Sequence, residues 1–189
     1  HLFIKKDLIS SIKSLTKTNN TMKPTILILV LAFIIVTGYV IGIAGKFKAR
    51  KSISDSDYWL TKPWKWLFEA MILSCSAALV YTSIYLDAMF MLIGSGMIGM
   101  VAPFARFKAN RFMRLGHVFF AFGGFIILGL SFGLDFGMWD KSVFIASMVG
   151  GVYVLTKKNK SVIWNVEIAL IYLLFYHIIY LVLNYRLAV

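Results

Sequence analysis

The chain has 189 residues, of which 60% are hydrophobic and 15% are charged, and its mean hydropathy is +0.80. Soluble domains are close to half apolar and a quarter charged, and the apolar excess here lies in long blocks, which excludes a soluble globular enzyme, a disordered tail and a fibrous repeat. The net charge of +12 does not indicate nucleic-acid binding, because the basic residues lie in short segments between the blocks and no soluble domain displays a basic face.

Residues 1–21 form a basic segment in which Leu8, Ile12 and Leu15 recur at helical spacing with lysines between them. This pattern is typical of an amphipathic helix that lies on a membrane surface. Alternatively, the natural chain begins at Met22, because the sequence from that methionine onward has the form of a first membrane helix. We favour the second explanation and expect residues 22–189 to form a six-helix transmembrane domain.

Six apolar blocks follow, each with about 18 or more residues and therefore long enough to cross a bilayer core. They are residues 24–45, 64–85, 87–105, 113–134, 138–156 and 162–185. Residues 67–104 are nearly continuously apolar and too long for one helix, so a turn is predicted at Tyr85–Asp87. Because no water satisfies backbone groups inside a bilayer, each block is predicted to be helical. The fold class is therefore all-α, a polytopic six-helix transmembrane bundle.

Basic residues are concentrated in every second connection between the blocks. Residues 46–62, 106–112 and 157–161 carry most of the Lys and Arg that follow Met22, whereas the connection near Asp87 carries none. The positive-inside rule predicts that these three basic loops are cytoplasmic, in a bacterial inner membrane or an equivalent organellar membrane. The lysines of residues 1–21 conflict with this orientation, since they precede the first block on the opposite side.

Polar residues recur at a nearly constant distance early in the second, fourth and sixth blocks. Glu69, His117 and Glu167 are 48 and then 50 positions apart. This spacing favours three helical-hairpin repeats, and duplicated hairpins often build a site on their shared axis. Alternatively, any six-helix protein with short loops has similar spacing, so both interpretations stay open.

The same three residues, Glu69, His117 and Glu167, are candidates for a polar cavity or a ligand or proton site. Each lies three to five residues inside its predicted helix, about 5–8 Å below the membrane interface. Ionisable groups at this depth are costly unless they face a cavity or a partner. Alternatively, they are interfacial residues that contact water or headgroups. No metal site is expected, because the Glu-x-x-His pair of carboxylate–histidine metal sites is absent.

His177 is the fourth candidate for this site and lies near the middle of the last block, between Tyr176 and Tyr180. A histidine at that depth should be neutral and hydrogen-bonded, either as a proton-relay group or as a packed side chain. Haem ligation by His117 and His177 together is not expected, because one is predicted near a membrane face and the other near the midplane. We therefore expect no cofactor.

Glycines at small-x-x-x-small spacing predict close packing of helices. One pair is Gly38 and Gly42, and a longer series is Gly129, Gly133 and Gly137. Alternatively, these glycines thin a helix wall beside a cavity.

Three hypotheses for function follow. The first is a non-enzymatic integral membrane protein of transporter, channel or sensor type. In this hypothesis Glu69, His117 and Glu167 form a polar layer near the cytoplasmic face. The second is a structural or accessory subunit of a larger membrane complex. The third, a lipid-processing enzyme using His117 and the carboxylates, lacks a nucleophile motif or a full metal set, so enzymatic chemistry is not expected.

The expected partners are anionic lipid headgroups at the basic loops and either a second copy of the chain or other membrane subunits, with no nucleic acid.

Overall fold

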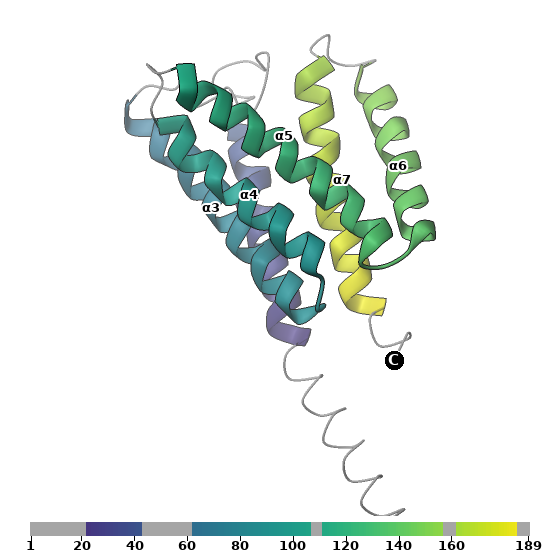
Figure 1. Ribbon diagram of the computed structural model, residues 1–189. Helices are drawn as coiled ribbons and strands as arrows, with labels where there is room; N and C mark the ends of the chain where they lie inside the picture. Colours follow the sequence, from purple (N-terminus) through teal and green to yellow (C-terminus); the bar gives the residue numbers. More distant parts are fainter. Residues whose placement is uncertain (1–21, 43–61, 107–110, 157–161, 185–189) are drawn as a thin grey trace, which may run out of the picture.

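The structure is a computed structural model that describes residues 22–42, 62–106, 111–156 and 162–184. These residues contain six helices and no strand. The helices are Met22–Gly42, α3 (Lys62–Tyr85), α4 (Met89–Arg106), α5 (Arg111–Leu134), α6 (Met138–Thr156) and α7 (Val162–Asn184). The predicted all-α six-helix bundle is thus confirmed for the described part of the chain (Figure 1). Residues 1–21, for which two explanations compete, lie outside the described residues.

Four of the six helices are long and apolar enough to cross a membrane, by length and composition. They are Met22–Gly42, Lys65–Tyr85, Arg111–Leu134 and Ile163–Asn184. The two remaining helices, α4 and α6, have 18 and 19 residues and contain shorter apolar stretches. A helix satisfies its own backbone polar groups, which is why such uninterrupted apolar sequence adopts this conformation in lipid. The four long helices indicate an integral membrane protein.

A tight turn at Leu86–Ala88 separates α3 from α4. Asp87 at its centre has a φ angle of 53°, a left-handed conformation in which aspartate is several-fold enriched over most residues. The backbone amides of Leu86 and Ala88 donate to carbonyl oxygens in the last turn of α3, each at 2.9 Å. The turn that the sequence predicts at Tyr85–Asp87 is therefore present and lies within one residue of that position.

The helices run alternately up and down the bundle. In Figure 1 the first residues of α3, α5 and α7 lie at one end, together with the last residues of the helices before them. The two described turns, Leu86–Ala88 and Asp135–Gly137, lie at the opposite end. The helix ends that the three basic loops join therefore all lie on the same side of the bundle.

Small and hydroxyl-bearing residues hold α3 against α4. The Ser76 hydroxyl donates to the carbonyl oxygen of Ser95 at 2.8 Å, and the hydroxyl oxygens of Ser83 and Ser95 are 3.5 Å apart. Gly99 allows the close approach, because a Cβ at that position would lie 2.6 Å from Ser76 Oγ. Hydrogen bonds between helices have little competition from water in a membrane and supplement the packing of small residues.

The Met22–Gly42 helix packs between α3 and α7 through aromatic side chains. Tyr39 lies beside Phe68 of α3, with ring centroids 6.1 Å apart. Phe33 contacts Tyr172 of α7 edge-on at 5.2 Å and Phe175 at 5.7 Å. Edge-to-face and tilted pairs at these separations are attractive beyond the area that they bury. The first described helix is therefore an integral part of the bundle.

Candidate functional site

Glu69, His117 and Glu167 lie in the second turn of α3, α5 and α7, which all begin at the same end of the bundle. They follow the first residues of their helices by seven, six and five positions. At about 1.5 Å per residue, they are roughly 8–11 Å from the helix ends. This is somewhat deeper than the sequence predicts, because α3 and α5 each begin two residues earlier than expected.

The three residues differ in burial. His117 is buried, with 2% of its surface exposed, whereas Glu69 and Glu167 are half-buried. Each of the three has an interaction partner within the protein. The imidazole is therefore shielded by the bundle, while the carboxylates keep partial access to the surroundings.

The structure does not gather these side chains into a metal centre. Among the described residues, no group of three or more His, Cys, Asp and Glu side chains lies close enough to hold a metal ion. The polar layer is instead distributed over three helices at a similar depth.

His177 lies in an aromatic cluster, which we define as His177, Phe132, Phe144 and Tyr180. The imidazole is 5% exposed and meets the ring of Phe132 edge-on, with centroids 4.5 Å apart. Phe144 and Tyr180 each lie 6.0 Å from it. Three helices therefore contribute to its surroundings: α5, α6 and α7. Tyr180 is 48% exposed, so the aromatic cluster reaches the surface of the bundle at this residue.

The two histidines lie at different depths. His177 packs against Phe132, which is fifteen residues after His117 on α5 and two residues before its last residue, Leu134. Fifteen residues of helix span about 22 Å, so His117 lies toward the basic-loop end of α5 and His177 is level with the other end of α5. Within α7, His177 is seven residues before the last residue, Asn184. The position of His177 near the membrane midplane stays a prediction.

The glycines at small-x-x-x-small spacing have few neighbours within the described part of the chain. A Cβ at Gly38, Gly42 or Gly137 would meet no atom within 4 Å, and one at Gly129 would make ordinary contact with Phe144 at 3.6 Å. Gly137 has a φ of 124° and serves the turn before α6. Contact of Gly38 and Gly42 with another molecule stays a prediction, as does a packing role for Gly133.

Close helix contact occurs instead between α4 and α5, at residues that the spacing rule does not select. A Cβ at Gly94 would lie 2.8 Å from Leu128 Cγ and 3.0 Å from its backbone nitrogen, and a Cβ at Gly124 would lie 3.2 Å from the Gly94 carbonyl oxygen. The available sequence signal was the small residues of Gly94-Ser95-Gly96 on one helix and Gly123-Gly124 on the next. Which of them face each other depends on the tertiary arrangement.

No protein-family model matches the chain, and neither a curated protein nor a solved structure matches it.

Proposed function

We propose that this membrane protein is of the transporter, channel or sensor type and that its operation depends on protonatable side chains at two depths. The observation that carries the proposal is the burial of His117 and His177 inside apolar helices, at 2% and 5% exposure. An ionisable group inside a membrane segment is costly, and such groups commonly mark proton or ion pathways. Histidine is the side chain whose ordinary titration range spans physiological pH.

In this proposal the two ends of the bundle have different roles. Glu69 and Glu167, half-buried in the second turns of α3 and α7, exchange protons with the side on which the basic loops lie. His177, with the exposed Tyr180 beside it, does so on the opposite side. About 22 Å along α5 separates the levels of the two histidines, so transfer between them requires intermediate hydroxyls or water.

The test is proton flux into liposomes that contain the purified chain, followed with an enclosed pH-sensitive dye. Glu69→Gln and Glu167→Gln keep the side-chain shape and remove the charge, and His177→Phe keeps a ring in the aromatic cluster. We expect each to reduce the flux or its pH response. Asp87→Asn is the matched control, because Asp87 is an exposed carboxylate in a turn outside the helices. Unchanged flux in all three variants would refute the roles assigned to these residues.

We further propose that the basic loops 46–62, 106–112 and 157–161 are cytoplasmic and contact anionic lipid headgroups. Their concentration of Lys and Arg supports this, since each basic residue near an anionic surface contributes about 1 kcal/mol. The membrane would be a bacterial inner membrane or its organellar equivalent. Labelling of single cysteines at the helix ends with an impermeant maleimide tests the sidedness.

A second candidate function is that of an accessory subunit in a larger membrane complex or a homo-oligomer. The specific observation in its favour is that Gly38 and Gly42 are exposed and that a Cβ at either would meet nothing within 4 Å. A small-x-x-x-small face of this kind allows another helix to approach closely. Native purification distinguishes the two, because a subunit co-migrates with other chains in fixed ratio. Gly38→Leu should release those chains.

A further inference from the structure

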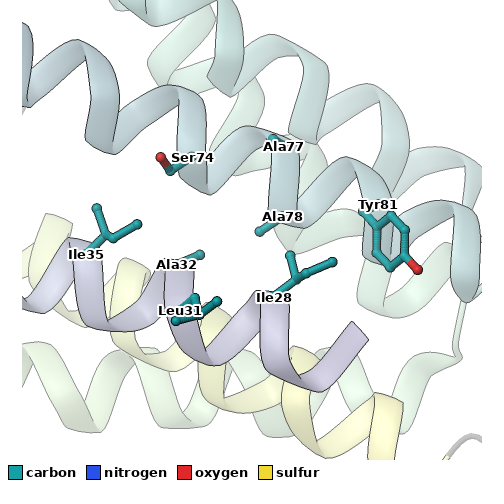
Figure 2. Close-up of a pocket in the computed structure, with 8 residues that line it drawn as sticks. All are labelled: Ile28, Leu31, Ala32, Ile35, Ser74, Ala77, Ala78 and Tyr81. Atoms are coloured by element: carbon teal, nitrogen blue, oxygen red, sulfur yellow. The ribbon is translucent and has the colours of Figure 1, made fainter. Parts of the chain in front are cut away.

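A groove opens on the side of the bundle between the Met22–Gly42 helix and α3. Its volume is about 380 Å³, and the eight residues that line it are Ile28, Leu31, Ala32, Ile35, Ser74, Ala77, Ala78 and Tyr81. Figure 2 shows the first four on one helix and the last four on the facing helix. We call this the lateral groove. Its room comes from small side chains, because Ala32, Ala77 and Ala78 fill little of the space between the helices.

From this geometry we propose that the lateral groove is a binding site for one acyl chain of a bilayer phospholipid. Both walls belong to helices that are long and apolar enough to cross a membrane, so the groove faces the hydrocarbon region. No charged residue lines it, which disfavours a polar solute. The proposal depends on insertion of these helices in a membrane and not on the proton-linked function proposed above.

The shape of the lateral groove suits an extended chain. Seven positions separate Ile28 from Ile35 and Ser74 from Tyr81, so each wall extends about 10 Å along its helix axis. The volume falls within the range of small-ligand pockets, about 300–1,000 Å³. An extended acyl chain therefore fits along the lateral groove.

Tyr81 lies at one end of the lateral groove and sets the direction of the lipid in this proposal. Tyr81 is 40% exposed and precedes the last residue of α3, Tyr85, by four positions, about 6 Å from the helix end. Tyrosine is enriched at this depth because its hydroxyl reaches the headgroup region while its ring stays in hydrocarbon. The Tyr81 hydroxyl can donate to a lipid ester carbonyl, with the chain running from Tyr81 toward Ser74. The lipid then belongs to the leaflet at the turn end of the bundle.

The test uses phosphatidylcholine with a photoactivatable diazirine in mid-chain, in vesicles that contain the full-length protein. After irradiation, mass spectrometry locates the lipid adducts along the Met22–Gly42 helix. We expect more adducts on Leu31 and Ile35 in the groove than on Leu27 and Ile34 outside it. Exposure alone predicts the reverse, since Leu27 and Ile34 are 59% and 58% exposed but Leu31 and Ile35 only 50% and 45%. Equal or reversed labelling would overturn the proposal.

Ala77→Phe fills the lateral groove and should lower labelling of Leu31 and Ile35 to the level of Leu27 and Ile34. The matched control is Ala70→Phe, which places the same ring on the same face of α3 seven residues earlier, at an exposed position outside the groove. If circular dichroism shows that Ala77→Phe has lost its helix content, the smaller Ala77→Leu replaces it. Identical labelling in the two variants contradicts the proposal. So does oxidative dimer formation by Leu31→Cys without lipid adducts, which would identify a second copy as the occupant.

Discussion

Asp135, in the turn after α5, caps the start of α4, which has no capping side chain of its own. The residue before Met89, the first of α4, is Ala88, whose side chain has no hydrogen-bond acceptor. Asp135, just after α5, accepts from the backbone amides of Phe90 at 3.3 Å and Met91 at 2.9 Å. These are the second and third residues of α4, the amides that a capping side chain normally satisfies. The negative charge also complements the positive end of the helix dipole.

Asp135→Ala should therefore lower the free energy of unfolding by about 0.5–2 kcal/mol, the usual cost of losing a helix cap. Asp135→Asn should cost less, because it keeps an acceptor oxygen. Asp87→Asn is the control, since asparagine tolerates the left-handed conformation of Asp87 and leaves the cap intact. Chemical denaturation in detergent micelles measures all three. An Asp135→Ala variant as stable as the wild type would show that the cap contributes nothing.

The aromatic cluster around His177 gives a prediction that separates packing from proton chemistry. His177→Ala removes a ring that touches Phe132 and leaves a cavity, at a cost comparable to other large-to-small core changes of about 2–5 kcal/mol. His177→Phe keeps a ring of similar shape and should retain most of the stability. Thermal unfolding compares the two. Equal destabilisation by both would mean that a polar contact of the imidazole, and not its ring packing, holds the site together.

Among the elements, α4 has the most restricted surroundings. One side approaches α3 through Ser95 and Gly99, and another approaches α5 through Gly94. Gly94 and Gly124 bring the two backbones together. The carbonyl oxygen of each glycine lies close to the place that a Cβ on the other would occupy. The hydrocarbon of a bilayer provides no hydrophobic force between helices, so this close van der Waals contact is a main source of their association. The position of α4 thus depends on residues without side chains.

Gly94→Ala should destabilise the bundle by about 1–3 kcal/mol, the typical cost of overpacking, because the new methyl group would meet Leu128 at 2.8–3.0 Å. Gly96→Ala is the matched control on the same helix, where a Cβ would meet nothing within 4 Å. The control should be neutral or more stable by up to about 1 kcal/mol, since alanine favours the helix over glycine. Thermal unfolding in micelles gives both values. Similar values for the two variants would contradict the observed packing of α4 on α5.

At the scale of the whole molecule, hydropathy predicts the helices to within a few residues. The blocks expected at 113–134 and 138–156 correspond to α5 at Arg111–Leu134 and α6 at Met138–Thr156. This accuracy has a physical cause, because the bilayer thickness sets the length of each apolar run and the runs end where polar residues begin. The turn within residues 67–104 was predictable from length alone, and Asp87 stabilises it.

The candidate site was less predictable. Sequence placed Glu69, His117 and Glu167 at one depth because each follows the start of its own helix. It did not reveal that His177 lies level with the far end of α5, since that depends on the stagger of two helices. The packing of Gly94 on Gly124 was missed for a related reason: spacing along one helix does not identify the face that meets a neighbour. The threefold hairpin repeat stays a prediction.

The central proposal is that the three basic loops connect helices at one face of the membrane and that this face is cytoplasmic. The most direct test replaces the buried Cys75 with Ala and introduces single cysteines at helix ends, for labelling with an impermeant maleimide in inverted and right-side-out vesicles. Lys65→Cys, Arg111→Cys and Ile163→Cys should react only in inverted vesicles, whereas Asp87→Cys and Phe136→Cys should react only in right-side-out ones. Reaction of the first three from different sides would contradict the bundle topology and, with it, the polar layer at a common depth.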